Sequence, residues 1–364
     1  MSRHPDLEKL NDPVTPSDGV AGVERPRGLL KALEEDAEPL LKMAHRHLVS
    51  ARQVSRAQLL QLARLAAAYE IDPVLEQKPL SGQLLITAFY EPSTRTRLSF
   101  ESAWHRLGGD VIPITDPSTT GIAKGESLHD VAEMLSNYGD AVVLRDSSED
   151  SVWRMIEALR VPIINAGNGI DEHPTQALAD LYALLKWRPE LAKLELDPQR
   201  RIRIGIIGTP ARMRTVRSLL LLLGLIASNI AEVTIINPDT DLFDPGQREE
   251  LEEAGLKISI SRKLKGLLPQ LDVVYINSIA WIGDTYETLT GDLELSTDSP
   301  LKPGAIVLHP LARGDELDTS LDPTPHNWYF AQARGAVFIR MALLTVLMQR
   351  VYRVADAPLP IESQ

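Results

Sequence analysis

Short apolar segments alternate with segments of helical periodicity over most of the chain, and this order limits the folds open to it. Parallel strands cannot be joined by a tight turn, so each needs a crossover, usually a helix, before the next strand. The predicted strands are Gln83–Tyr90, Asp110–Pro113, Asp140–Leu144, Pro162–Asn165, Arg203–Ile207, Glu232–Ile236, Asp272–Ile276 and Ala305–His309. The predicted helices include Ser55–Tyr69, Ser93–Leu107, Leu128–Tyr138, Ser151–Ala158, Thr175–Trp187, Thr215–Ser228, Gln247–Glu253 and Ala331–Val351. The sequence therefore predicts an α/β fold class with doubly wound parallel sheets flanked by helices.

The chain has 364 residues, which is long for one domain and sufficient for two. The stretch Trp187–Arg201, which contains two prolines, separates two series of strands, so we expect one domain over residues 34–187 and a second over residues 188–330. Residues 1–33 are expected to form an N-terminal extension, because the segment up to about Arg27 lacks periodicity. The closing apolar helix, residues 331–353, is predicted to cross back and complete the first domain.

Composition excludes several classes of protein. The chain contains no cysteine, which excludes disulfides, thiolate nucleophiles and thiolate metal ligands. Its formal net charge of −12 argues against non-specific binding to nucleic acid, which needs a basic surface. No apolar run reaches the roughly 18 residues of a membrane-spanning helix, and the N-terminal segment lacks the apolar core of a signal peptide. We therefore expect a cytoplasmic protein without nucleic-acid or membrane partners.

The stretch Ser93–Arg97 (STRTR) gathers three hydroxyls and two guanidinium groups between an apolar strand and a helix. Free backbone N–H groups and the positive end of the helix dipole favour an anion at such a place. Arginine adds forked donors that suit a phosphate or a carboxylate. The simpler interpretation is a helix cap with two surface arginines, but five donors in succession exceed what capping requires. The stretch therefore predicts an anion site.

Residues 201–219 read as a strand, a glycine-containing turn and a helix, which invites a dinucleotide-binding interpretation. The glycine spacing is G-x-x-G, which is not the G-x-G-x-x-G of such sites. Only Asp239 offers an acidic residue near the end of the following strand. We therefore expect no dinucleotide site here.

Four motifs in order resemble one enzyme family. The strand–STRTR–LSFE–helix segment is followed by HPTQALADLYALL from His173, by HPLARGDEL from His309 and by NWYFAQARGAVFIRMALL. Together they resemble the aspartate/ornithine carbamoyltransferase family over roughly Glu38 to Arg350, and the last motif is more similar to the aspartate branch. The resemblance implies a carbamoyltransferase that moves the carbamoyl group of carbamoyl phosphate to an amine. L-aspartate is the default acceptor, giving N-carbamoyl-L-aspartate for pyrimidine biosynthesis. The first domain would bind carbamoyl phosphate and the second the acceptor.

The resemblance also implies roles for individual residues. Catalytic roles would fall to Arg95, Lys124, Arg145 and His173. Carbamoyl phosphate would be bound by Ser93, Thr94, Arg95, Thr96, Arg97, Thr120, Lys124, Arg145, His173, Gln176 and Leu311. The acceptor would contact Arg214, which would hold its α-carboxylate, and Ser278, Ala280, Leu311 and Ala312. No metal or other cofactor is expected, because carbamoyl transfer needs none and a histidine followed by Pro and Gln offers no ligand set.

For several of these residues the sequence alone leaves a simpler interpretation open. Arg145 could be a surface arginine at a strand end, His173 a helix cap, and the loop with Thr120 and Lys124 an ordinary solvated loop. In the family this loop reaches into the neighbouring subunit's site. The resemblance therefore implies a homotrimer with shared active sites, and it leaves a larger assembly open.

One segment departs from the family pattern. In INSIAWIGDTYETL, Ser278 stands where the aspartate enzymes have an arginine for the acceptor's side-chain carboxylate, and Ala280 where they have a glutamine. Leu311 is followed by Ala312 instead of proline, so we expect a cis proline to be lost. An arginine–carboxylate contact in a desolvated site contributes about 2–5 kcal/mol, so this change bears on the acceptor.

Three hypotheses follow from this departure. Arg217, Lys263 or Lys265 could supply another cation for aspartate. Alternatively, the acceptor could be a different amino acid or small amine. In the third hypothesis the chain is a non-catalytic, trimeric binding or regulatory protein. The retained donor-site residues argue against that third hypothesis.

Overall fold

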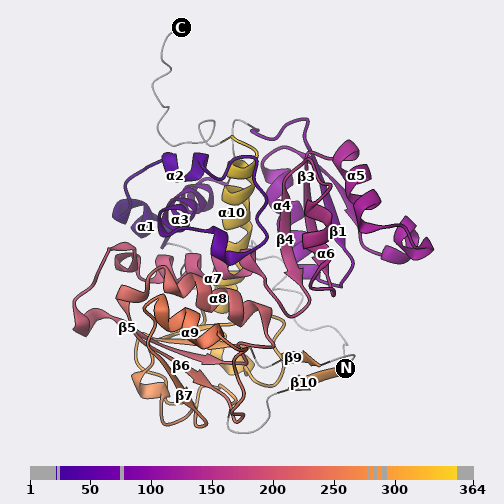
Figure 1. The fold of residues 1–364 in the computed structure, drawn as a ribbon. Coiled ribbons are helices and arrows are strands. Elements are labelled where there is room, and N and C mark those ends of the chain that lie inside the picture. The colour runs from indigo at the N-terminus through magenta and orange to yellow at the C-terminus, as the bar shows by residue number, and fades with distance from the viewer. Residues whose placement is uncertain are drawn as a thin grey trace, which may run out of the picture.

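The computed structural model describes residues 22, 25–73, 78–277, 279–282, 285–288 and 293–350. Two parallel sheets with flanking helices make up this part of the chain (Figure 1). The first sheet has the strand order β2-β1-β3-β4, with β1 (Leu84–Phe89), β2 (Asp110–Ile114), β3 (Ala141–Asp146) and β4 (Ile163–Asn168). The second has the order β11-β8-β5-β6-β7, with β5 (Ile202–Ile207), β6 (Ile230–Ile236), β7 (Ile258–Ser261), β8 (Val273–Ile276) and β11 (Ile306–Leu308). The predicted fold class is confirmed.

Every predicted strand is present, but three strands were missed. β7 lies at an edge of the second sheet and reads ISIS, which is too short to give a clear strand pattern. β9 (Ile279–Ile282) and β10 (Thr285–Thr288) form an antiparallel pair in the segment that departs from the family pattern. Only the backbone of this pair is described.

The helices follow the predicted order, with shifted ends. α8 ends at Gly224, four residues before the predicted end, and a 3-10 turn over Ala227–Asn229 follows it. α3 begins after a capping box in which Ser55 and Gln58 satisfy each other's backbone N–H groups. The helices are α1 (Pro26–Ala32), α2 (Glu38–Leu41), α3 (Arg56–Ile71), α4 (Thr94–Arg106), α5 (Leu128–Tyr138), α6 (Ser151–Ile156), α7 (Pro174–Trp187), α8 (Arg214–Gly224), α9 (Gln247–Glu253) and α10 (Tyr329–Leu347).

Part of the expected N-terminal extension is folded. α1 lies inside residues 1–33, contacts α3 and α7, and buries Leu29 completely. The sequence pattern did not show this, because one buried leucine and one proline in seven residues give no periodicity. Residues 1–21, 23 and 24 lie outside the described part of the chain.

α10 ties the two halves of the fold together. It runs between α3 and α4 (Figure 1) and packs against α3, α4 and α7, as predicted for a helix that crosses back to the first domain. It is the one helix among the described residues that is long and apolar enough to cross a membrane. Because 78% of its most apolar 18-residue stretch is buried inside the protein, α10 is a core helix.

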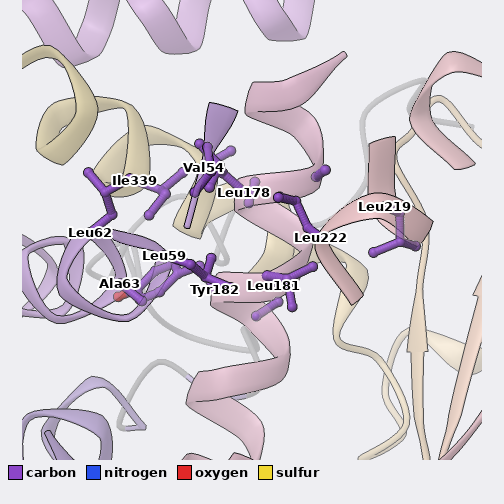
Figure 2. Close-up of a cluster of buried hydrophobic side chains, with 14 of the residues drawn as sticks. Val54, Leu59, Leu62, Ala63, Leu178, Leu181, Tyr182, Leu219, Leu222 and Ile339 are labelled. Carbon is purple, nitrogen blue, oxygen red and sulfur yellow. The ribbon is translucent and has the colours of Figure 1, made fainter. Parts of the chain in front are cut away.

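One apolar cluster continues from the helices of the first sheet to those of the second. Figure 2 shows side chains from α3, α7, α8 and α10 meeting in this cluster. Tyr182 of α7 and Leu222 of α8 are fully buried in it. Burying one leucine stabilises a fold by roughly 1.5–3 kcal/mol, so this shared core holds the two sheets in a fixed relation. That relation brings the carboxyl ends of strands from both sheets to one cavity.

Candidate active site

A cavity of about 910 Å³ lies between the two sheets. Its walls come from the carboxyl end of β3 and from the segments after β1, β4, β5, β8 and β11. The first turn of α7 and one face of α10 complete them. In open parallel sheets ligands bind beyond the carboxyl ends of the strands, and this cavity has that position in both sheets.

The first wall is the start of α4, as the STRTR stretch predicted. Ser93, Thr94, Arg95 and Thr96 line the cavity. Ser93 is the N-cap residue, but its side chain makes no capping hydrogen bond, which disfavours the simple capping interpretation. Burial lowers the pKa of the Arg95 guanidinium, which still remains charged at neutral pH.

Arg97 does not line the cavity. Its guanidinium pairs with Glu101, one turn further along α4, at 3.2 Å. The STRTR side chains are therefore not all at the cavity wall, and the role of Arg97 in binding carbamoyl phosphate stays a prediction. On a helix, neighbouring positions point in different directions, so five successive side chains cannot share one face.

Glu91 joins the two halves of the cavity. Its carboxylate accepts hydrogen bonds from Arg145, near the carboxyl end of β3, at 2.5 Å and from Arg214, at the start of α8, at 2.6 Å and 2.9 Å. Burial raises the pKa of Glu91, but the Arg214 hydrogen bond and the charge of Arg145 more than offset this, so the pKa is lowered overall. Burial and the charge of Arg214 lower the pKa of Arg145 to about 10. The cluster holds two cations and one anion, so one positive charge is left to face a ligand.

His173 and Gln176 line the cavity from the first turn of α7. His173 is only 3% exposed, and its backbone N–H donates to the Ser218 hydroxyl at 2.9 Å. Burial, with the charges of Arg145 and Arg214, holds the pKa of His173 well below its usual range. The imidazole is therefore neutral and can donate one ring N–H to a ligand oxygen.

The loop after β11 presents backbone groups to the cavity. The His309 ring accepts the Leu311 N–H at Nδ1, 2.7 Å away, and its Nε2 lies 2.8 Å from Glu316. Since Nδ1 accepts, Nε2 carries the proton and donates to Glu316. Leu311 has a positive φ of 59°, and the Leu311–Ala312 peptide is cis. Position 312 is therefore alanine instead of the family's proline, but the peptide bond before it is still cis.

The acceptor side contains a cation that the sequence analysis missed. Arg212 lines the cavity, is exposed, and its guanidinium makes no hydrogen bond or ion pair with another described residue. Arg217, an earlier candidate, instead pairs with Asp244 and donates to the Ala211 carbonyl. The other two candidates, Lys263 and Lys265, do not line the cavity.

The remaining predicted positions fall into three groups. Ser278 lies outside the described residues, and Ala280 is described only as backbone in β9. Thr120 and Lys124 lie beside and within a 3-10 turn over Gly121–Lys124, and neither lines this chain's own cavity. Leu311, Ala312 and Arg214 do line it.

Three further lining residues carried only weak sequence signals. Glu91 lies two residues after the end of β1, outside the STRTR stretch that the sequence analysis singled out. Gln332 and Arg340 face the cavity from α10, eight residues apart and therefore on one face of the helix. Their spacing in an otherwise mostly apolar helix was the sequence signal that could have identified them as site residues. No group of three or more His, Asp or Glu residues in the described ranges could hold a metal ion.

Comparison with known proteins gives one consistent family. The model described as the carbamoyl-P binding domain of aspartate/ornithine carbamoyltransferase matches residues 46–186. The model described as the Asp/Orn binding domain matches residues 200–347. The aspartate carbamoyltransferase catalytic subunit of Methanopyrus kandleri is 37% identical over 315 residues, which cover 84% of this chain and 98% of the relative. That of Methanococcus vannielii is 39% identical over 310 residues, with 83% and 98% covered.

Solved structures agree with the sequence comparison. Aspartate transcarbamoylase from Trypanosoma cruzi in complex with carbamoyl aspartate and phosphate has a TM-score of 0.74 and 32% identity, covering 85% of this chain and 98% of that one. The same enzyme with N-(phosphonacetyl)-L-aspartic acid has a TM-score of 0.74 and 31% identity, covering 86% and 99%.

Proposed function

The chain belongs to the aspartate/ornithine carbamoyltransferase family, and from this premise we propose that it transfers the carbamoyl group of carbamoyl phosphate to L-aspartate. The products would be N-carbamoyl-L-aspartate and phosphate, as in pyrimidine biosynthesis. One observation carries the proposal. The donor-rich start of α4 and the Arg145–Glu91–Arg214 cluster face the same cavity, so a phosphate site and a carboxylate site lie side by side.

The phosphate of the donor would lie at the start of α4. The first helical turn has free backbone N–H groups there, and Thr94, Arg95 and Thr96 all line the cavity at that place. Arg95 would also stabilise the charge that develops on the bridging oxygen as the phosphate leaves.

The carbamoyl group would lie between the starts of α4 and α7. The neutral His173 ring would donate an N–H to the carbonyl oxygen, and this hydrogen bond would strengthen as the oxygen becomes an oxyanion. The amine lone pair of aspartate would then form a new C–N bond. The bond from carbon to the bridging oxygen would break with its electron pair, and the amine proton would go to the departing phosphate. No covalent bond to the protein forms in these reaction steps.

The acceptor's two carboxylates require two cationic contacts. Arg214 would hold the α-carboxylate, because the Arg145–Glu91–Arg214 cluster keeps one positive charge in excess. We assign the side-chain carboxylate to Arg212, whose exposed guanidinium lines the same side of the cavity. Arg212 would thus take the role that the family gives to an arginine at the position of Ser278.

Assembly, domain division and location are further parts of the proposal. The exposed turn with Thr120 and Lys124 would complete the cavity of a neighbouring copy, which gives a homotrimer with shared sites and leaves a larger assembly open. We keep the division into a donor domain over residues 34–187, completed by the closing helix, and an acceptor domain over residues 188–330. A cytoplasmic location fits a biosynthetic enzyme of this kind.

An acceptor panel tests the function. Purified protein is given carbamoyl phosphate with aspartate, asparagine, ornithine or a neutral amino acid, and released phosphate and the carbamoylated product are both measured. We expect equal amounts of phosphate and N-carbamoyl-L-aspartate with aspartate, and neither with Arg95→Ala. Turnover only with another amine would replace aspartate as the acceptor. No turnover with any amine, although carbamoyl phosphate binds, would contradict the proposal.

A further inference from the structure

Asp180 is a fully buried carboxyl group one helical turn after Gln176. It lies on α7 and is 0% exposed. Its Oδ1 accepts a hydrogen bond from Gln176 Nε2 at 2.8 Å and another from Gln332 Nε2, on α10, at 2.5 Å. A buried carboxyl is costly unless it is well satisfied, so its place beside a cavity-lining residue requires a physical reason.

The contact fixes which end of each glutamine amide faces which way. Both amides turn their NH₂ groups towards Asp180, because its Oδ1 accepts the hydrogen bond from each of them. The Gln332 carbonyl oxygen then accepts the His309 backbone N–H at 2.9 Å, which confirms its orientation. The Gln176 carbonyl oxygen is left pointing away from Asp180, and Gln176 lines the cavity.

We propose that Asp180 is a positioning residue, which turns the Gln176 amide so that its carbonyl oxygen accepts a hydrogen bond from the NH₂ of the carbamoyl group. This inference rests on the proposed function, because it needs a carbamoyl donor in the cavity. A flipped amide would present its own NH₂ to the substrate NH₂, and two donors cannot bond to each other. The acidic side chain is therefore what lets a glutamine recognise the donor's amide end.

The groups around Asp180 support this role. Burial raises the pKa of Asp180 to about 7, and the hydrogen bonds from Gln332 and Gln176 and the charge of Arg340 act in the opposite direction. Arg340, on α10, is itself 2% exposed and lines the cavity. The carboxyl, itself on α7, is thus held by hydrogen bonds from Gln176 of α7 and Gln332 of α10.

A double-mutant cycle tests the inference. The values of kcat/KM for carbamoyl phosphate are compared among wild type, Asp180→Ala, Gln176→Ala and the double variant. We expect Asp180→Ala to lower kcat/KM by about 10- to 100-fold, in the range of one lost charged hydrogen bond. Because Asp180 acts through Gln176, the kcat/KM of the double variant should be no lower than that of the more defective single variant. Effects that multiply instead would show that Asp180 acts through another group and would overturn the inference.

N-(phosphonacetyl)-L-aspartate provides the control for an intact site. Its phosphono, carbonyl and aspartyl groups resemble both substrates together, but it has a CH₂ linkage and lacks the carbamoyl NH₂. Asp180→Ala should therefore bind it within about threefold of wild type in isothermal titration, while losing carbamoyl phosphate turnover. Equal losses for both ligands would mean a collapsed cavity and would also overturn the inference. If wild type binds this compound but transfers no carbamoyl group, the proposed function fails instead.

A second substitution separates positioning from bulk packing. Asp180→Asn keeps one acceptor oxygen at almost the same place, so it should retain most of the turnover that Asp180→Ala loses. Glu70→Gln is the matched control, because Glu70 is another buried acid, bonded to Lys186 of α7 at 2.8 Å, and does not line the cavity. Glu70→Gln should lower stability and leave kcat/KM unchanged. If Asp180→Asn is as defective as Asp180→Ala, the orientation argument is wrong.

Discussion

The carboxylate of Glu91 lies 2.6 Å from the guanidinium of Arg214, and this contact joins the segment after β1 in the first sheet to the start of α8 beside the second. The same carboxylate reaches Arg145 at 2.5 Å. Two arginines that would repel each other are thereby held side by side at the cavity wall. The position of the acceptor's α-carboxylate relative to the donor depends on this one acidic residue.

Replacement of this carboxylate should therefore be costly for turnover. Loss of a hydrogen-bonded charge pair at a desolvated site costs roughly 2–5 kcal/mol, so Glu91→Gln should lower kcat/KM for aspartate at least about 30-fold. Steady-state kinetics with saturating carbamoyl phosphate measures this. An unchanged kcat/KM in a folded Glu91→Gln protein would show that the bridge does not position the acceptor.

The assignment of Arg212 gives a prediction about the acceptor. Charged hydrogen bonds contribute about 1.5–3 kcal/mol, so Arg212→Gln should raise KM for aspartate by about 10- to 100-fold while kcat changes little. Asparagine lacks the side-chain charge, so its kcat/KM should be no lower with this variant than with wild type. Arg217→Gln is the matched control, since Arg217 pairs with Asp244 and does not line the cavity. Equal KM values in the Arg212 and Arg217 variants would remove the assignment.

The proposed shared site predicts complementation between two inactive proteins. Arg95→Ala and Lys124→Ala should each lose nearly all turnover. In a mixed trimer, however, one cavity can receive an intact Arg95 from its own chain and an intact Lys124 from its neighbour. Mixing the two variants after reversible dissociation should therefore restore a fraction of wild-type activity. Subunit exchange shown by mass spectrometry without any recovered turnover would mean that each chain builds its own site.

The buried Asp180 makes stability depend on pH in a defined direction. Its pKa is raised to about 7 in the folded chain, mainly by burial, while an unfolded aspartate has an ordinary value near 3.9. The folded state therefore binds this proton more tightly, and its contribution to stability falls as pH rises from about 4 to 7. Asp180→Asn should remove that part of the slope and gain stability relative to wild type above pH 7. Thermal unfolding midpoints of both proteins at several pH values between 5 and 8 measure the difference, and parallel curves would contradict it.

Much of the fold could be predicted from the sequence, because strands buried on both faces and their crossover helices leave regular patterns. β7, β9 and β10 could not, since strands of four residues are too short to give a clear periodic pattern. α1 was missed for a related reason, because its docking depends on the single side chain of Leu29.

The candidate site was predictable only where residues cluster along the chain. STRTR, His173 and Gln176 form compact motifs, and the cavity includes four of the five STRTR positions and both α7 residues. Glu91 acts through partners distant in sequence, and Asp180 joins the nearby Gln176 to the distant Gln332. Glu91 and Arg214 are 123 positions apart, and Asp180 and Gln332 are 152 apart. No local pattern can reveal such pairs, because they depend on how the two sheets are packed.

Binding of N-(phosphonacetyl)-L-aspartate to the wild-type protein tests the central claim most directly, since this compound must occupy the phosphate site and the acceptor site together. Isothermal titration should give one site per chain. Arg95→Ala should weaken binding by about 100-fold or more through the phosphono group, and Arg212→Gln by about 10-fold or more through the side-chain carboxylate. Absence of binding to the folded wild-type protein, or binding that neither substitution weakens, would contradict a cavity built for carbamoyl phosphate and aspartate.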